Sequence, residues 1–425
     1  MMSFFRSFFR QRFQSIAPSI RRIYASPRRK TATSSSRSAE DVLDYWLYKA
    51  IDMAASDIHF ERYKTYLKVR YRIDGKLQTI RQLAIPLHSG MITRVKILAN
   101  LKIDEKRIPQ DGRFSLVYKD QKWDIRVSII PGYFGECMVL RLLNVGSEKI
   151  SLQGLGARPQ DVQLLAQLTA APNGMIVVAG PTGSGKSTTL YAIIRQIASP
   201  ERKVITVEDP VEYQLPGISQ VAVNEAIGMT FATALRSLLR QAPNIILVGE
   251  IRDRETAEIA VRAALTGHLV LTTVHAKNAI NVITRFFDFD IPPYLIAATL
   301  RAVLSQRLVR TLCPHCLQIK RFDPEKFSTI APEVVLPPFN KIRVGESIGC
   351  DQCSHTSYKG RRAIMEILPI SENIRKMIDQ RCSEDAIRQQ AQSEGMETLR
   401  DIAIQHYLNG TLGEEALRSL LAEVA

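Results

Sequence analysis

The sequence predicts an α/β fold, with a parallel sheet covered by helices and a smaller α+β domain before it. Three observations predict it. Four short apolar runs alternate with segments of helical periodicity, at residues 175–178, 204–207, 244–248 and 268–274. A glycine-rich turn follows the first run, and polar residues follow the others. Alternating strands and helices form parallel sheets, whose carboxyl edge binds ligands, so these residues mark the expected site.

The composition is that of a globular protein of roughly two to three domains. The 425 residues are 45% apolar and 23% charged. No apolar run approaches the roughly 18 residues that a membrane-spanning helix needs. The net charge is +15, but residues 1–39 supply nine basic and no acidic side chains, while the rest holds 48 basic and 42 acidic ones. Because this main body is only mildly basic, composition does not indicate a nucleic-acid partner.

Residues 1–39 have the composition of a mitochondrial presequence. On a helical wheel, Ile16 and the phenylalanines share one side, while arginine, serine and glutamine share the other, except Arg12. Arg- and Ser-rich amphipathic segments without acids are typical of transit peptides. The tripeptide Arg22-Ile23-Tyr24, followed by Ala25, also resembles a matrix-processing site. A basic arm, or an amphipathic helix on an anionic membrane, would have the same composition.

Residues 40–147 are expected to form the small α+β domain. A helical pattern at 42–51 precedes an alternating segment at 66–73, and Asp74-Gly75 predicts a hairpin turn after it. Further strands are expected at 113–118, 123–130 and 137–143. The arginines of this segment stand out, and without a family comparison they fit solvated strand edges: Arg94, Arg107, Arg113, Arg126 and Arg141.

The glycine-rich turn at residues 180–187 fits the phosphate-loop pattern G-x-x-x-x-G-K-[ST]. Its backbone N–H groups would surround the β-phosphate, Lys186 would reach the β- and γ-phosphates, and Ser187 would hold Mg²⁺. The following helix adds the positive end of its dipole. We therefore predict ATP and Mg²⁺ binding, with a flexible Gly/Ser turn as the alternative. The expected nucleotide-binding residues are Gly180, Pro181, Thr182, Gly183, Ser184, Gly185, Lys186, Ser187 and Thr188.

Polar residues after the other strands complete the predicted crevice. Glu208, Glu250 and His275 each follow a strand, so a parallel sheet brings them to the edge of the phosphate loop. Attack by water on a phosphate needs a base, and we assign this role to Glu250. Ordinary phosphate-loop enzymes place an acid where this chain has Gly249, so Glu208 or Asp209 would supply the missing charge. Each acid alone also fits a helix cap or a turn, and a buried structural histidine would look like His275.

Two C-x-x-C pairs predict a zinc site. Cys313 and Cys316 precede Cys350 and Cys353, with 33 residues between the pairs. Each turn presents two thiolates, and four thiolates complete a tetrahedral Zn²⁺ site of structural type. Matched pairs favour metal in a reducing compartment over disulfides. Reduced structural cysteines and redox thiols are the alternatives.

Several longer motifs together resemble one known family. They read ASDIHFE (55–61), RIDGKL (72–77), EKRIPQDGRF (105–114), DIRVS (124–128), GPTGSGKSTTLYA (180–192), TVEDPVEY (206–213), VGEIRDRETAEIA (248–260), AALTGHLVLTTVHA (263–276), QRLVRTLCPHC (306–316) and GCDQCSHTSYKGR (349–361). From about residue 42 to 425, the chain resembles the ATPases of the type II secretion and type IV pilus family. This likeness is far more specific than the phosphate loop alone.

The resemblance implies a RecA-like P-loop ATPase domain with a smaller N-terminal α+β domain, a tetracysteine zinc element and a helical C-terminal region. The expected segments are a presequence (1–39), the N-terminal domain (40–147), a linker (148–155), the ATPase core (156–306), the zinc-binding element (307–361) and C-terminal helices (362–425).

The resemblance also implies roles and partners. Family members are homohexameric motors that hydrolyse ATP and drive assembly of a pilus-like fibre through an inner-membrane platform protein, with peripheral membrane association through partners and no nucleic acid. Arginines of the first lobe reach the γ-phosphate, and Arg113 and Arg126 match them. Glu208 lies in the family's acidic box, Glu250 is its Walker B glutamate, and His275 belongs to its histidine box.

Some residues depart from the family pattern. Ala242 and Asn244 stand where the family usually has two aspartates, which removes two charges that we expect near the site. The longer members carry an extra N-terminal docking domain, where this chain has its presequence-like segment. Retraction ATPases lack the four cysteines, so these favour the assembly and secretion branch. With the presequence, the chain resembles the motor of a mitochondrial type II secretion machine, located in the matrix at the inner membrane. A bacterial pilus-assembly ATPase in the cytoplasm at the inner membrane is the alternative.

Two other functions share the same core. A nucleic-acid translocase would also use a RecA-like domain, although no strip of interleaved basic and aromatic residues is visible. A scaffold that binds ATP without turnover is the third hypothesis, and Ala242 and Asn244 motivate it.

Overall fold

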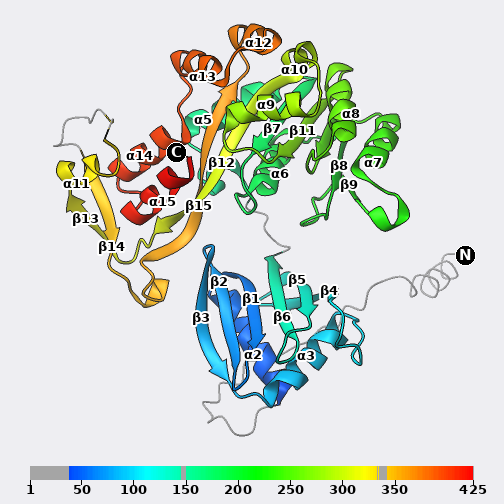
Figure 1. Ribbon diagram of the computed structural model, residues 1–425, viewed down its shortest axis with the longest axis vertical. Helices are drawn as coiled ribbons and strands as arrows, with labels where there is room; N and C mark the ends of the chain where they lie inside the picture. Colours follow the sequence, from blue (N-terminus) through cyan, green and yellow to red (C-terminus); the bar gives the residue numbers. More distant parts are fainter. Residues whose placement is uncertain (1–37, 145–149, 333, 335–341, 425) are drawn as a thin grey trace, which may run out of the picture. The chain divides into compact units, whose positions relative to one another are not determined.

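The computed structural model describes residues 38–144, 150–332, 334 and 342–424, and the chain divides into two compact units between residues 147 and 148 (Figure 1). The predicted presequence lies outside the described residues except for residues 38 and 39, and residues 148 and 149 of the predicted linker lie outside them as well. Within the described ranges, every helix is too short or too polar to cross a membrane.

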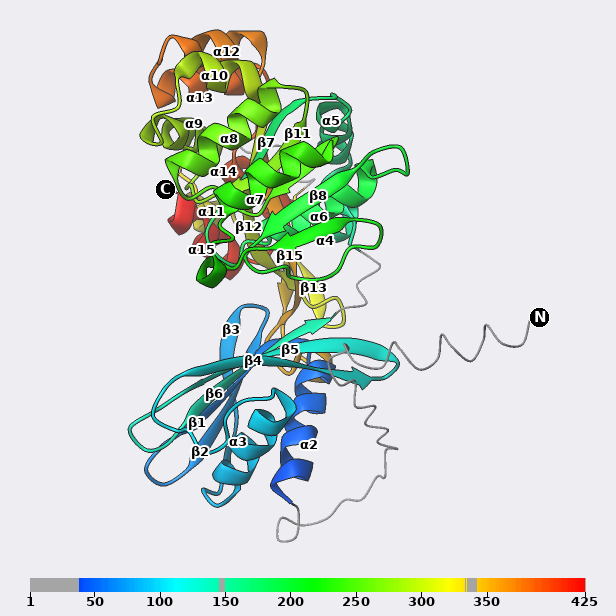
Figure 2. The same ribbon diagram turned by 90° about the vertical axis from the view of Figure 1, so that its right-hand side faces the viewer.

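The first unit is an antiparallel six-stranded sheet in the order β3-β2-β1-β6-β5-β4. Helices α2 and α3 pack against each other over one face, around a common apolar core (Figure 2). The elements are α2 (Ala39–Asp52), β1 (Ala55–Arg62), β2 (Leu67–Ile73), β3 (Lys76–Leu83), α3 (Leu87–Leu98), β4 (Gln110–Tyr118), β5 (Gln121–Ile130) and β6 (Cys137–Asn144).

The local sequence explains the turn between β2 and β3, but it does not explain helix α3. Asp74 and Gly75 join β2 to β3 with positive φ angles of 47° and 85°, as a two-residue hairpin turn requires. The sequence pattern does not predict α3, which contains a glycine and several β-branched residues. Buried Lys96 of this helix lies with its Nζ 2.6 Å from the Glu136 carboxylate, and tertiary contacts of this kind override a weak helix propensity.

The second unit is built on a mixed seven-stranded sheet in the order β15-β12-β7-β11-β10-β8-β9. Its elements are α4 (Leu152–Leu155), α5 (Pro159–Thr169), β7 (Gly174–Ala179), α6 (Lys186–Ile197), β8 (Val204–Glu208), β9 (Ser219–Ala222), α7 (Phe231–Leu238), β10 (Ile245–Val248), α8 (Arg254–Leu265), β11 (Leu269–Val274), α9 (Ala279–Asp288), α10 (Pro293–Thr299), β12 (Leu300–Leu312), β15 (Tyr358–Pro369), α12 (Glu372–Asp379) and α13 (Glu384–Ser393). The four predicted strands are β7, β8, β10 and β11, and they run parallel, which confirms the predicted α/β class.

Helices cover both faces of this sheet, which is why its strands are continuous apolar runs. Alternate residues of β7 face opposite sides: Val177 packs with α7 to α10, and Val178 packs with α4 to α6. All six residues of β7 are buried. The sheet therefore holds the carboxyl ends of β7, β11 and β10 side by side, at the edge where the predicted site residues follow.

The expectation that the chain is helical from residue 362 is wrong for residues 362–369. These residues belong to β15, which pairs antiparallel with β12 from Ala302↔Pro369 to Leu312↔Tyr358. The hydrophobic periodicity of a short apolar run does not distinguish a strand from a helix, so pairing with a neighbouring strand determines its structure. Strand β12 also continues beyond residue 306, parallel to β7 at its start. The zinc element thus leaves and rejoins the core sheet through two long strands.

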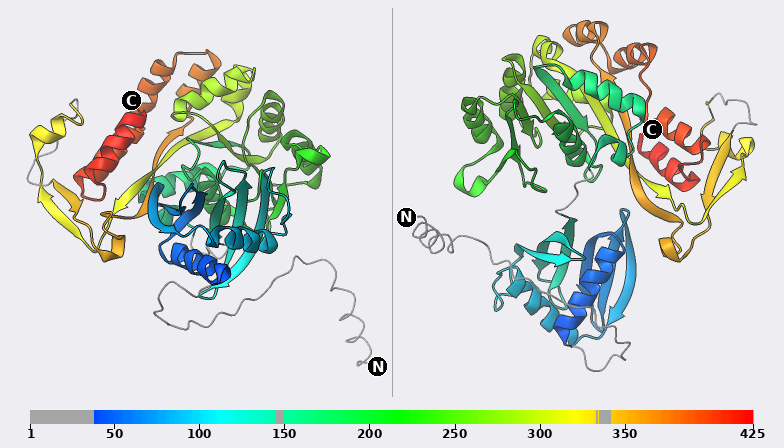
Figure 3. Two further views of the ribbon diagram at one scale, coloured as in Figure 1. Left: turned by 60° about the horizontal axis from the view of Figure 1, so that its bottom comes forward. Right: turned by 180° about the vertical axis from the view of Figure 1, so that it is seen from behind.

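The remaining elements form a small layer beside β12 and β15. They are β13 (Leu317–Arg321), α11 (Pro324–Ser328), β14 (Arg343–Ser347), α14 (Leu399–Leu408) and α15 (Glu414–Val424). Helices α14 and α15 lie between the β12–β15 pair and the two-stranded β13–β14 sheet (Figure 1 and Figure 3).

A buried carboxylate ties this layer to the core. Glu366 of β15 is 3% exposed, and its two oxygens accept from the backbone N–H groups of Ala279 (3.0 Å) and Leu399 (3.1 Å). These groups open α9 and α14, so one side chain caps two helix N-termini, where a negative charge is favourable.

Candidate active site

The phosphate loop connects β7 to α6, as predicted. Gly180 and Gly185 have φ angles of 147° and 86°. A Cβ added to Gly180 would lie 2.6 Å from the Gln306 carbonyl oxygen, and one added to Gly185 would lie 2.9 Å from the Gln306 side chain. Only glycine fits so close an approach, and the resulting turn leaves backbone N–H groups at the start of α6 for an anion. Pro181, Thr182, Gly183 and Ser187 are exposed, Thr188 is half-buried and Ser184 is buried.

Gln306 fixes this loop from the neighbouring strand. Its buried side chain donates to the Ser184 carbonyl oxygen (2.6 Å) and accepts from the Thr189 hydroxyl (2.6 Å). One residue of β12 therefore ties both the loop and the first turn of α6 to the sheet. Sequence reasoning did not single out Gln306, although it opens one of the resemblance motifs.

Lys186, Glu250 and His275 meet at the predicted edge. Lys186 donates to the carbonyl oxygens of Gly180 (2.9 Å) and Pro181 (3.0 Å). His275 Nε2 lies 3.6 Å from a Glu250 carboxylate oxygen. The other carboxylate oxygen of Glu250 accepts from Arg252, a residue that sequence reasoning missed.

The electrostatics of this edge reflect burial and neighbouring charge. Burial is the main cause that lowers the pKa of Lys186, and Glu250 opposes it while Arg307 adds to it. Burial also lowers the pKa of His275, Lys186 adds to this shift, and Glu250 opposes it. Glu250 is thus the negative group that Lys186 and His275 share, which suits a base held beside the phosphate loop.

Glu208 lies at the end of β8 but points elsewhere. It is 4% exposed, and it accepts from the hydroxyls of Tyr191 on α6 and Thr206 (2.5 Å) and from Gln220 Nε2 (3.2 Å). Its contacts anchor α6 to the sheet rather than reach Glu250. Asp209 is the acid that faces the site, since Arg252 lies 3.8 Å from it while also contacting Glu250.

The position of Ala242 and Asn244 corrects an expectation. They precede β10, whereas Glu250 follows it, so they lie at the opposite edge of the parallel sheet from the phosphate loop. Six residues of strand span roughly 20 Å. Asn244 Oδ1 accepts from the Lys203 backbone N–H (2.8 Å), which joins two strand starts. The two lost charges are therefore not near the Lys186–Glu250 edge within this chain.

The predicted arginines belong to the first unit. Arg113 of β4 and Arg126 of β5 are directly paired across the sheet, and Arg126 pairs in turn with Arg141 of β6. Arg141 Nε donates to Asp57 (2.9 Å), which also lies 3.4 Å from Arg72. Three arginines thus form one row across adjacent strands.

The four predicted zinc ligands come together. The sulfur atoms of Cys313, Cys316, Cys350 and Cys353 all lie within 4.8 Å of one another. Sulfur separations are 3.9 Å for Cys313–Cys350, 3.9 Å for Cys316–Cys353 and 3.8 Å for Cys350–Cys353. A tetrahedral site with 2.3 Å Zn–S bonds has sulfurs about 3.8 Å apart, so the cluster fits Zn²⁺.

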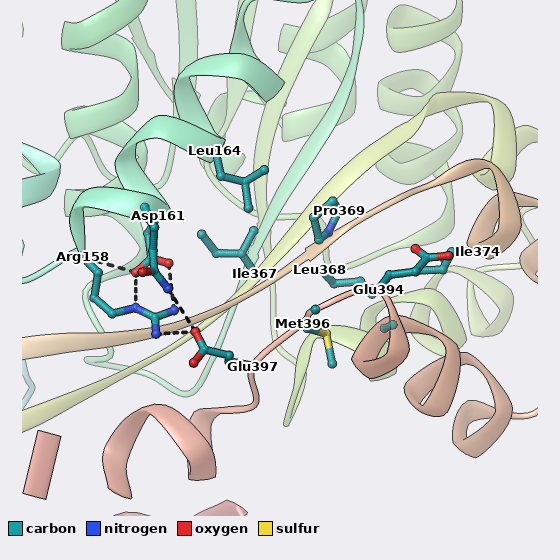
Figure 4. Close-up of a pocket in the computed structure, with 13 residues that line it drawn as sticks. Arg158, Asp161, Leu164, Ile367, Leu368, Pro369, Ile374, Glu394, Met396 and Glu397 are labelled. Carbon is teal, nitrogen blue, oxygen red and sulfur yellow. Dashed lines mark hydrogen bonds and ion pairs between the residues drawn. The ribbon is translucent and has the colours of Figure 1, made fainter. Parts of the chain in front are cut away.

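A hollow of about 330 Å³ lies elsewhere in the second unit, between α5, β15 and the α13–α14 connection (Figure 4). Arg158 pairs there with Asp161 (2.9 Å) and Glu397 (2.5 Å), and Leu164 and Ile367 form an apolar wall. Because its cation is already neutralised, this hollow is no candidate for a phosphate.

The chain matches known proteins along most of its length. The model of the family described as "Type II/IV secretion system protein" matches residues 32–419. The type II secretion system protein E of Pectobacterium carotovorum subsp. carotovorum is 45% identical over 378 residues, which cover 89% of this chain and 74% of that protein. The type II secretion system ATPase E of Vibrio cholerae serotype O1 is 41% identical over 378 residues, with the same coverage.

Solved structures show the same architecture. The pilus retraction motor PilT with bound ADP has a TM-score of 0.60 at 26% identity, covering 89% of this chain and 96% of its own. The ATPase DotB of Legionella pneumophila has a TM-score of 0.67 at 21% identity, covering 92% and 98%, which shows the shared fold. The chain therefore belongs to the type II/IV secretion system protein family and is one of its ATPases.

Proposed function

We propose that this ATPase is a homohexameric motor of a type II secretion-type system, and that it drives assembly of a pilus-like fibre through an inner-membrane platform protein. The observation that carries the proposal is that Lys186, Glu250 and His275 lie together at the carboxyl edge of the sheet. The chain that carries them belongs to the type II/IV secretion system protein family. The secretion role rests on the relatives that are named as type II secretion proteins.

In this proposal Lys186 binds the β- and γ-phosphates, and Glu250 accepts a proton from the attacking water. Arg252 and His275 contact the two oxygens of Glu250 and orient them. Ser187, the exposed second residue of α6, would hold Mg²⁺, which neutralises phosphate charge. The buried contacts of Glu208 favour a role in positioning α6. Asp209 would supply the carboxylate that other phosphate-loop enzymes have at the position of Gly249.

The family resemblance assigns Arg113 and Arg126 of the first unit to the γ-phosphate, and we carry this role over as part of the proposal. The two arginines are directly opposite each other on neighbouring strands, so one phosphate could accept hydrogen bonds from both. An arginine in this role is worth roughly 10³–10⁵ in rate.

The four-cysteine cluster supports a bound Zn²⁺ with a structural role, since four thiolates fill its coordination sphere. The compartment stays a prediction from residues 1–39, which favour the mitochondrial matrix, whereas the relatives named above are bacterial and favour a bacterial cytoplasm at the inner membrane. Sequencing the amino terminus of the mature protein separates the two, because a start near Ala25 supports import and a start at Met1 contradicts cleavage.

The chemistry is tested with Glu250→Gln in the full chain. The amide cannot accept a proton, so phosphate release from ATP should fall about 10²–10⁴-fold while ATP still binds. Glu258→Gln is the matched control, because this glutamate pairs with Arg254 on the outside of α8. Full hydrolysis by Glu250→Gln would sink the assignment of the base.

A further inference from the structure

Arg307 is a buried cation that the proposed mechanism does not use. It follows Gln306 in β12, and it is 6% exposed. One guanidinium nitrogen donates to the Gln306 carbonyl oxygen (3.1 Å), and another donates to the Lys277 carbonyl oxygen (2.7 Å). Its Nε has no hydrogen-bond partner among the described residues.

These contacts place Arg307 beside the phosphate loop. The Gln306 oxygen that it binds is the same atom that a Cβ on Gly180 would approach to 2.6 Å. Lys277 lies two residues after His275, in the connection from β11 to α9. The guanidinium is thus held between the phosphate loop and the connection that follows His275, and its charge acts on Lys186.

The charge of Arg307 is poorly compensated. Its ion-pair partner in the described part of the chain is Glu423, near the end of α15, with 3.5 Å between Nε and a carboxylate oxygen. Glu423 is 55% exposed, and a half-exposed pair without a hydrogen bond stabilises little. A buried cation without a strong anionic partner costs free energy. Burial accordingly lowers the pKa of Arg307, an effect that Glu423 and Glu366 oppose.

We propose that Arg307 binds the terminal phosphate of ATP, and that Glu423 competes with this phosphate for the guanidinium. Arginine suits this task, because its planar donors match phosphate oxygens. The inference rests on the proposed ATP site at Lys186 and adds to it a second phosphate-binding cation and a competitor from the last helix.

This arrangement links the nucleotide to the C-terminal layer. Helix α15 packs with α14 and with residues of the zinc element in one apolar cluster. When the phosphate takes Arg307, Glu423 loses its partner, and the end of α15 is released from β12. ATP and ADP would then differ in how firmly α15 is held.

The test measures affinities of the full chain for a non-hydrolysable ATP analogue and for ADP. Arg307→Gln should lose about tenfold or more in affinity for the ATP analogue and much less for ADP, because hydrogen bonds to charged groups are involved. Glu423→Gln should gain about two- to fivefold for the ATP analogue, because it removes the competitor. Arg307→Lys should restore part of the preference for ATP.

Arg310 and Glu415 provide matched controls. They form a 3.0 Å ion pair between the same strand and the same helix, next to Tyr358 rather than the phosphate loop. Arg310→Gln and Glu415→Gln should leave both affinities unchanged.

The outcomes separate this inference from the proposed function. A wild-type chain that neither binds nor hydrolyses ATP would contradict the proposed function itself. Wild-type binding with an unchanged ATP-to-ADP ratio in Arg307→Gln would overturn the role of Arg307. If Arg307→Gln fails to fold, an unchanged affinity of Glu423→Gln for the ATP analogue overturns the competition.

Discussion

Competing charges organise the site at the scale of single residues. Glu250 contacts Arg252 and His275, while Lys186 is bonded to the carbonyl oxygens of its own loop. None of these side chains is locked in a fully buried network, whereas Glu208 is. The side chains proposed to contact the nucleotide thus stay accessible, whereas Glu208, which positions α6, is buried.

His406 predicts a pH-dependent stability of the second unit. It is 8% exposed, and burial lowers its pKa to about 4, with Arg362 adding to the shift. Its pKa in the unfolded chain is about 6.5, so the neutral form stabilises the fold above that pH, and this stability is lost as pH falls toward 4. Denaturant unfolding should show a loss of about 2 kcal/mol from this group between pH 7 and pH 5.

His406→Gln should remove most of that pH dependence. His355, whose side chain is 73% exposed, is the matched control, and His355→Gln should leave it intact. An equally steep loss of stability in His406→Gln would show that other groups cause it.

At the scale of elements, the zinc cluster should hold β12, β14 and β15 together. Its cysteines lie just after β12 and between β14 and β15, and among the described residues their apolar cluster contains the four cysteines alone. Metal binding in small zinc elements contributes about 10 kcal/mol or more. We expect one zinc per chain by metal analysis, and Cys353→Ser should lose the metal and open residues near the cluster to proteolysis.

Cys382→Ser serves as the control, since Cys382 packs at the edge of the ATPase core, away from the cluster. A metal-free wild-type chain that resists proteolysis as well as the loaded one would contradict this role.

The secondary-structure elements also differ in how well they can be predicted from the sequence. Strands β7, β8, β10 and β11 are readable because each is a local apolar run, and a helix directly follows all of them except β8. Strand β15 and helix α3 are not, because a partner far along the chain decides their state: β12 for β15, and Glu136 for the buried lysine of α3.

The same division holds for the site. Lys186, Glu250 and His275 follow strands of a parallel sheet, and the topology alone brings them together. Gln306 and Arg307 depend on the parallel pairing of β12 with β7, whose partners lie more than a hundred residues apart. The direction of Glu208 depends on Tyr191 and Thr206, which a strand-end rule does not contain.

At the scale of the whole molecule, each of the two units carries part of the proposed machinery. The second unit carries the phosphate loop and the base, and the first carries Arg113, Arg126 and Arg141 in one cross-strand row. The motifs around these arginines are readable from the sequence through the family resemblance. The expected homohexamer also comes from the resemblance alone, because no physical pattern in one chain states how many copies assemble.

The most direct test of the motor measures phosphate release from ATP by the full chain over a range of concentrations, with the molar mass followed by light scattering. We predict that the rate per chain rises with the fraction of hexamers. Arg126→Gln should assemble as the wild type does but lose about 10³-fold or more in rate. Arg81→Gln, at an exposed position on β3 of the same unit, should keep the wild-type rate. Full turnover by monomers, or a wild-type rate in hexameric Arg126→Gln, would contradict the account.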